Sequence, residues 1–257
     1  MINNPTHALF RKVARSFPSY YAKKNINISL GFAERQHEKY VQVFKDAGLK
    51  VSFVPTDESK PDGVFIEDTA VIWQDYALIT QMCSERQGEQ KDVEEILKKT
   101  HTIVHMPSVA KLEGGDVLHT ENTTYVGISK RTNDLGASCL KNFLKKFNRE
   151  VVKIPVEKCL HLKSGISYIG DNTLVAVENM FDMSLFDTEN VIYTAEGEER
   201  AANCMRIPNN LLVQSQYPKT ADLLEHFAAD KGLQFHPLET TEFSKADGSL
   251  TCMSLLW

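Results

Sequence analysis

Side chains that can carry out covalent and proton-transfer chemistry lie in four short motifs along the chain. Two motifs are acidic (PDGVFIEDTAV and LEGGDVL), one holds a histidine (CLHLKSG), and the last holds a cysteine (KADGSLTCMSLLW). They supply Asp62, Glu67, Asp68, Glu113, Asp116, His161 and Cys252. In one shared cavity, the thiol would act as a nucleophile, the imidazole would move protons, and the carboxylates would bind a cation.

Each of these residues also has a purely structural interpretation. Cysteine is among the residue types most often buried, so Cys83, Cys139, Cys159 and Cys204 are expected to pack in or beside apolar runs. A Glu-Asp pair at the start of a strand is commonly solvated, and EGGD can be a simple glycine turn. A functional site is favoured because the reactive groups fall at equivalent repeat positions, and because buried carboxylates are costly without cationic partners.

The spacing of the motifs predicts a repeat. Strand pairs begin near Asp68, Asp116, His161, Asn203 and Cys252, which are 48, 45, 42 and 49 residues apart by subtraction. Apolar periodicity predicts helices over residues 33–47, 88–100, 133–147 and 219–231, with a shorter one over 180–187. In the fourth helix Leu223, Leu224 and Phe227 are expected to face inward. A period of roughly 40–50 residues with strands and one helix is typical of propellers and solenoids.

The end of the chain favours a closed ring over an open array. A solenoid needs polar terminal caps, whereas this chain ends in Ser-Leu-Leu-Trp, an apolar strand that can pair with the first module. A doubly wound open sheet is the alternative, but no G-x-G-x-x-G motif follows an early strand. We therefore predict an α/β fold, a five-bladed pseudo-symmetric propeller of ββαβ modules, forming one catalytic domain over residues 1–257. Equivalent positions of such a ring converge on its axis.

Composition excludes several classes of partner. The chain has 29 Lys+Arg and 34 Asp+Glu, a net charge of −5, which gives no basic patch for nucleic acid or an anionic membrane. No stretch approaches the ~20 apolar residues of a membrane span, and no secretory signal is visible. The five cysteines are odd in number and lack CxxC spacing, which favours free thiols in a reducing, cytoplasmic compartment. No metal or organic cofactor is expected.

Six ordered motifs carry a resemblance to a known family: PDGVFIEDTAV, LEGGDVL, GISKRTN, CLHLKSG, AANC and DGSLTCMSLL. From about residue 33 to the end, the chain resembles the dimethylarginine dimethylaminohydrolase family of the guanidine-modifying (pentein) superfamily. The resemblance implies a five-bladed α/β propeller. It also implies hydrolysis of asymmetric dimethylarginine or monomethylarginine to citrulline and dimethylamine or methylamine, through a covalent thiouronium intermediate on cysteine.

The resemblance further implies catalytic roles for three residues. Cys252 matches the nucleophile, His161 the general acid and base, and Glu113 the acid that orients the histidine.

Substrate contacts are implied in the same way. Asp68 matches the carboxylate that holds the guanidinium, and Asp62 and Glu67 match other substrate contacts. Arg131 matches a clamp for the α-carboxylate, and the backbone carbonyl of Ala246 matches an acceptor for the α-amino group.

Two segments depart from the family pattern. After ALIT the family usually reads RPGA before Ser-Arg-Arg, whereas this chain reads QMCSERQ, one residue shorter, and Arg86 is the candidate for the second carboxylate clamp. The lid near the amino terminus usually offers a leucine, whereas this chain has Tyr20-Tyr21. We take Tyr20 as the candidate lid contact, which would change access or the preferred N-substituent.

Lys163 separates the candidate activities. Arginine and agmatine deiminases usually carry an acid two residues after the histidine, whereas this chain has Lys163. An N-alkylated guanidinium has fewer N–H groups to satisfy, so the loss of one carboxylate favours a methylated arginine as the small-molecule substrate. The alternatives are an arginine deiminase or amidinotransferase, a zinc site on Cys252, His161 and Glu113, and a non-catalytic binder of an arginine derivative. Two copies could pair as a homodimer through an outer helix or a blade edge.

Overall fold

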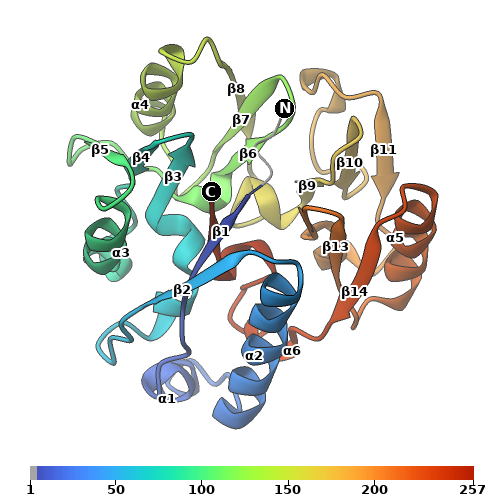
Figure 1. The fold of residues 1–257 in the computed structure, drawn as a ribbon, viewed down its shortest axis with the longest axis horizontal. Coiled ribbons are helices and arrows are strands. Elements are labelled where there is room, and N and C mark those ends of the chain that lie inside the picture. Colours follow the sequence, from blue (N-terminus) through green and yellow to red (C-terminus); the bar gives the residue numbers. More distant parts are fainter. Residues whose placement is uncertain (1–4) are drawn as a thin grey trace.

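The computed structural model describes residues 5–257, and within them the strands form five three-stranded sheets around an axis (Figure 1). In every sheet the first strand pairs antiparallel with the second, which pairs parallel with the third. The first strands are β3 (Ala70–Trp73), β6 (Val117–His119), β9 (Ile166–Tyr168), β12 (Met205–Ile207) and β15 (Leu255–Leu256). The second strands are β1 (His7–Arg11), β4 (Tyr76–Ile79), β7 (Thr123–Ile128), β10 (Thr173–Ala176) and β13 (Asn210–Gln214). The third strands are β2 (Lys50–Val54), β5 (Thr102–His105), β8 (Glu150–Pro155), β11 (Asn190–Tyr193) and β14 (Gln234–Leu238). This arrangement confirms the predicted propeller.

Helices lie around the outside of the ring, between the second and third strands of most blades (Figure 1). Amphipathic sequence explains their position, because each buries one apolar stripe on its own sheet. In the helix that follows Asn133, for example, Leu140 and Leu144 are fully buried while Lys141 and Lys145 are exposed. The four outer helices in residues 5–257 are α2 (Leu30–Asp46), α3 (Gln90–Leu97), α4 (Asp134–Lys145) and α5 (Pro218–Asp230).

Two expectations about helices are wrong. The predicted helix over residues 180–187 is a single 3-10 turn, Met183–Leu185, started by Asp182, whose side chain accepts a hydrogen bond from the Ser184 amide. Leu223 of α5 is 47% exposed, because the buried stripe runs through Thr220, Leu224 and Ala228. The stripe therefore turns Leu223 to solvent.

Two further short helices were not expected from the periodicity. They are α1 (Ser16–Ala22) and α6 (Thr241–Ser244), and each has fewer than three turns. Such short segments carry too few apolar positions to show a period. No helix within residues 5–257 is long and apolar enough to cross a membrane.

The ring is closed by the two ends of the chain. Strand β15 pairs with β1 so that Leu255 lies opposite Leu9 and Leu256 opposite Ala8. The Trp257 carbonyl accepts the His7 amide at 2.9 Å, and the two rings stack with centroids 5.3 Å apart. The last strand therefore belongs to the first blade, as the apolar ending of the sequence predicts, and the carboxyl terminus lies near the centre of the ring (Figure 1).

Ring closure predicts a large stability difference between two leucine truncations. Leu255→Ala should lower the free energy of unfolding by about 2–5 kcal/mol, because Leu255 is 6% exposed in the core beneath β1 and β3. Leu223→Ala removes the same atoms from the exposed face of α5 and should change it by less than about 0.5 kcal/mol. Urea unfolding followed by circular dichroism measures both, and equal midpoints would contradict the account of closure.

Candidate active site

The predicted reactive residues lie in or beside short turns that precede the first strand of each blade. Because these turns occupy equivalent places in the ring, they meet around the axis, and neighbouring turns contact one another. The turns are Ile66–Thr69, Gly114–Asp116, Leu162–Ser164, Glu199–Ala202 and Thr251–Met253. Residues 185 positions apart, Glu67 and Cys252, can thus share one site by subtraction of their numbers.

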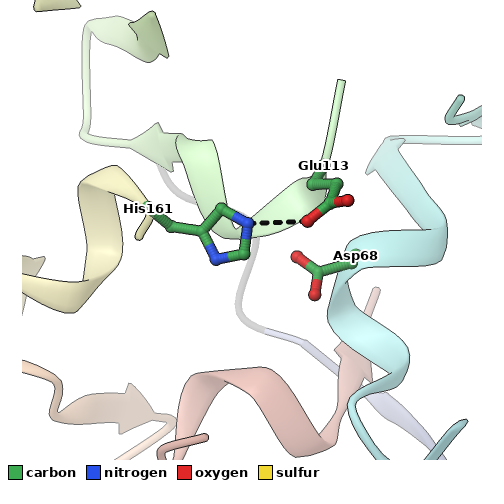
Figure 2. Close-up of side chains that lie close together, drawn as sticks. All are labelled: Asp68, Glu113 and His161. Atoms are coloured by element: carbon green, nitrogen blue, oxygen red, sulfur yellow. Dashed lines mark hydrogen bonds and ion pairs between the residues drawn. The ribbon is translucent and has the colours of Figure 1, made fainter. Parts of the chain in front are cut away.

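His161 and Glu113 form a buried pair at the centre of the site (Figure 2). His161 Nε2 lies 2.7 Å from Glu113 Oε2, and the two residues are 6% and 0% exposed. Glu113 also accepts hydrogen bonds from the Cys83 amide at 2.9 Å and from Arg131 Nη1 at 3.0 and 3.1 Å. The carboxylate is therefore held by partners from three different segments, and it fixes the orientation of the imidazole.

Charge around this pair shifts both of its proton equilibria. Burial would raise the pKa of Glu113, but the hydrogen bond and charge of His161, together with Arg131, lower it to about 2. Burial would lower the pKa of His161, but the charge of Asp68 and the hydrogen bond to Glu113 raise it above its ordinary value. The imidazole therefore keeps a proton more readily than a free histidine does, as a general acid requires.

Asp116 holds the turn that carries His161. Its Oδ1 accepts the Leu162 amide at 2.9 Å and its Oδ2 accepts the Ser129 hydroxyl at 2.7 Å. The side chain is fully buried, so these bonds are what make its burial tolerable. Asp116 thus positions the histidine by holding the backbone of the residue that follows it.

The two glycines of EGGD allow the turns to approach closely. A Cβ on Gly115 would lie 2.7 Å from His161 Nδ1, and one on Gly114 would lie 2.1 Å from the Glu67 carbonyl oxygen. The Gly115 amide meanwhile donates to Asp68 Oδ1 at 2.8 Å. Larger residues would separate the histidine from the acids, so the glycines belong to the site.

Asp68 and Arg86 form a second buried pair. Arg86 Nη1 donates to Asp68 Oδ2 at 2.6 Å, and the same guanidinium bonds Glu89 and the Phe65 carbonyl. Arg86 is only 7% exposed, so most of its donors are engaged inside the protein. The structure therefore places the candidate second carboxylate clamp against the acid expected to hold the guanidinium, with most of its donors already engaged.

Cys252 lies among carboxylates in the turn Thr251–Met253. Burial, followed by the charges of Glu67 and Asp68, raises the pKa of its thiol to about 12. Glu67 itself is held by Lys163 Nζ at 2.5 Å and by the Thr251 hydroxyl at 3.0 Å. A pKa this high keeps the Cys252 side chain a protonated thiol at neutral pH in the free protein.

Two cavities meet at the thiol and the imidazole. One, of about 330 Å³, is lined on one side by Glu67, Lys163 and Thr251. The other, of about 60 Å³, holds most of the predicted substrate contacts. Cys252, His161, Leu160 and Asp247 line both. The smaller cavity is lined by Tyr21, Asp62, Phe65, Asp68, Arg86, Arg131, Leu160, His161, Ala246, Asp247, Gly248 and Cys252.

The two tyrosines near the amino terminus, one of them the candidate lid contact, point in different directions. Tyr20 was the candidate, but its hydroxyl accepts a hydrogen bond from Lys24 at 3.0 Å, and it lines neither cavity of the described chain. Its neighbour Tyr21 points inward instead, and its hydroxyl donates to Asp62 Oδ1 at 2.8 Å. Adjacent residues of a helix face about 100° apart, so only one of the two can reach the site. The sequence alone offered no signal for which one.

Asp68, Glu113 and His161 also form the kind of cluster that could hold a metal ion. One ligand atom from each lies within 4.8 Å of the others, and all three residues are buried (Figure 2). Cys252 does not belong to this cluster, which differs from the zinc set of Cys252, His161 and Glu113 weighed above.

Comparisons with known proteins agree with this fold. One similar structure is that of DDAH from Pseudomonas aeruginosa, a mutant with serine in place of a cysteine, complexed with citrulline. It superposes with a TM-score of 0.89 at 27% identity, covering 98% of this chain and 99% of that one. The N-terminal domain of the cyanobacterial arginine dihydrolase ArgZ superposes with a TM-score of 0.84 at 20% identity, covering 97% and 96% of the two chains, and so shares the fold. The ring of repeated modules therefore places this chain in the pentein class.

Sequence relatives narrow the class to a family. The family model described as "N,N dimethylarginine dimethylhydrolase, eukaryotic" matches residues 9–201. The N(G),N(G)-dimethylarginine dimethylaminohydrolases of P. aeruginosa and Streptomyces coelicolor are 30% and 34% identical, covering 87% and 88% of this chain and 87% and 86% of theirs. The chain belongs to the dimethylarginine dimethylaminohydrolase family.

The buried pair predicts a shift of the histidine's proton equilibrium. Because the negative charge of Glu113 stabilises the protonated imidazole, Glu113→Gln should lower the pKa of His161 by about 1–3 units. Titration of the histidine ring signals by NMR, assigned with His161→Ala, measures it. Glu94→Gln removes the acid 3.0 Å from the exposed His105 and should leave the His161 titration unchanged. An unchanged pKa of His161 in Glu113→Gln would contradict the pairing.

Proposed function

We propose that this protein hydrolyses Nω-methylated arginine, giving citrulline and methylamine or dimethylamine. The observation that carries the proposal is the smaller cavity, of about 60 Å³, whose lining gathers a thiol, an imidazole, three carboxylates and two guanidinium groups. Family relatives named as dimethylarginine dimethylaminohydrolases, and the citrulline complex of one of them, support this substrate class.

The lining offers a partner for each charged group of a methylated arginine. The guanidinium lies against Asp68, whose charge compensates its own. Arg131 holds the α-carboxylate, and its side chain is 26% exposed, so a ligand can reach it. Asp62 and the carbonyl of Ala246 receive the α-ammonium group. Arg86 completes the charge balance around Asp68 and supports the carboxylate end.

Bond making begins at Cys252. The bound cation favours the thiolate, so the thiol proton passes to solvent and the sulfur attacks the central guanidinium carbon. The bond from that carbon to the methylated nitrogen then breaks, and His161 donates its proton to the departing amine. The product of this half is a thiouronium group on Cys252.

Hydrolysis of that group completes the reaction. The neutral imidazole of His161 takes a proton from water, and the hydroxide oxygen bonds to the thiouronium carbon. The carbon–sulfur bond breaks, citrulline forms, and the thiolate of Cys252 recovers a proton when product leaves. Glu113 stabilises the imidazolium in both halves through its 2.7 Å contact.

The pairing of Lys163 supports a methylated substrate over arginine. Lys163 Nζ lies 2.5 Å from Glu67 Oε1 and neutralises one carboxylate beside the thiol. A guanidinium that has lost N–H groups to methylation needs fewer acceptors there. We therefore assign preference to monomethylarginine and asymmetric dimethylarginine.

The setting of the enzyme is also part of the proposal. The five cysteines of the described chain are all free, which supports a reducing, cytoplasmic compartment. A homodimer formed through an outer helix or a blade edge would be seen by sedimentation.

Citrulline assays test the function directly. Wild-type protein should release citrulline from asymmetric dimethylarginine, and Cys252→Ser should lower the rate at least about a thousandfold, because the nucleophile is lost. Cys139→Ser changes a half-buried thiol on the outer helix α4 and should keep the wild-type rate.

Three results would contradict the proposal. Equal turnover by Cys252→Ser would exclude nucleophilic catalysis by this residue. Ammonia released from arginine at a comparable rate, or an amidino group transferred to an amine, would identify one of the sister activities. Activity lost to a chelator and restored by zinc would replace the thiol mechanism with a metal-dependent one.

A further inference from the structure

Tyr21 occupies the end of the smaller cavity where Asp62 and Ala246 lie. Its hydroxyl donates to Asp62 Oδ1 at 2.8 Å and is 3.5 Å from the carbonyl oxygen of Ala246. These three residues come from α1, from the turn Pro61–Val64 and from the loop after α6. The tyrosine thus joins the two groups to which the proposed function assigns the substrate's α-ammonium.

Packing fixes this hydroxyl in place. Tyr21 is 7% exposed, and its ring packs against Phe17 with centroids 5.1 Å apart and against Tyr20 at 5.2 Å. Helix α1 rests on the turn Pro61–Val64, which carries Asp62. Burial and the charge of Asp62 raise the pKa of Tyr21, so the hydroxyl remains a donor at all physiological pH values.

Three hydrogen-bond acceptors remain around Tyr21, the number that a primary ammonium group needs. Within residues 5–257, Tyr21 is the only side chain that hydrogen-bonds to the Asp62 carboxylate, so Asp62 Oδ2 stays available. The carbonyl of Ala246 is a second acceptor, and the lone pairs of the Tyr21 oxygen are a third. An ammonium group has three N–H donors, and an amide nitrogen has at most two.

We propose that Tyr21 is a specificity-determining residue that selects substrates with a free α-amino group. The Tyr21 hydroxyl orients Asp62 by donating to Oδ1, and the lone pairs of the same hydroxyl oxygen provide an added acceptor. The protein would therefore prefer the free methylated amino acid to the same side chain without an α-amino group. This inference rests on the proposed function and deepens it.

Binding measurements in a Cys252→Ser background test the inference without turnover. The ligands are monomethylarginine and its desamino analogue, which keeps the methylguanidinium and the carboxylate. Isothermal titration calorimetry should show a preference for monomethylarginine that falls about tenfold in Tyr21→Phe, the size expected for one hydrogen bond to a charged group. Affinity for the desamino analogue should stay within twofold, which a merely structural role of Tyr21 would not allow.

Further variants locate the effect. Tyr193→Phe removes the same atom from a tyrosine that is 40% exposed on the outer strand β11, and it should keep the full preference. Asp62→Asn should abolish most of the preference, and adding Tyr21→Phe to it should cause little further loss.

Distinct results would overturn the inference. It fails if Tyr21→Phe weakens both ligands equally, if it weakens neither, or if Tyr20→Phe produces the loss instead. Each of these leaves the proposed hydrolysis standing when wild-type protein still releases citrulline. Absence of citrulline from wild-type protein defeats the proposed function instead, while the calorimetric preference still reports on Tyr21.

Discussion

Buried carboxylates at the axis of the ring must each find a partner from another part of the chain, and the site depends on this constraint. Glu113 is paired with His161 and Arg131, Asp68 with Arg86, and Glu67 with Lys163. An unpaired charge at these depths would be strongly destabilising, whereas a paired one is tolerated. The same contacts that make burial possible set the protonation of the histidine and the thiol. The ion pairs that stabilise the buried carboxylates therefore also determine the proton equilibria of the site.

The fold supplies these partners by symmetry. Within residues 5–257 the predicted nucleophile, base and cation-binding acid come from different blades, and every blade places a turn at the axis before its first strand. Closing the ring is then part of building the site, because β15 follows the Cys252 turn directly and is held by β1. A chain that failed to close would leave the thiol without its acidic neighbours. The glycines of EGGD matter for the same reason, since the turns touch with no room for a side chain.

Much of this could be predicted from sequence, and the remainder has identifiable physical causes. The repeat spacing and the apolar final strand predict the closed ring, because strand period and burial are local signals. The residues gathered around the axis follow from the same period. What the sequence could not reveal depends on contacts between distant segments. These contacts decide whether Tyr20 or Tyr21 faces inward, and they pair Arg86 with Asp68 and Glu89. Leu223 shows the limit within one helix, because the apolar pattern alone does not reveal that the buried stripe of α5 runs through Thr220, Leu224 and Ala228.

The central claim is that burial, together with the acids around Cys252, keeps it a thiol until a guanidinium cation arrives. Ultraviolet absorbance of the thiolate, taken as the difference between wild type and Cys252→Ser, measures this along a pH titration. The account predicts a pKa of about 12 in the free protein. It predicts a pKa lower by one or more units, on the scale of a nearby opposite charge, when methylguanidinium is added. A thiolate already present at neutral pH in the free protein, and indifferent to the cation, would contradict it.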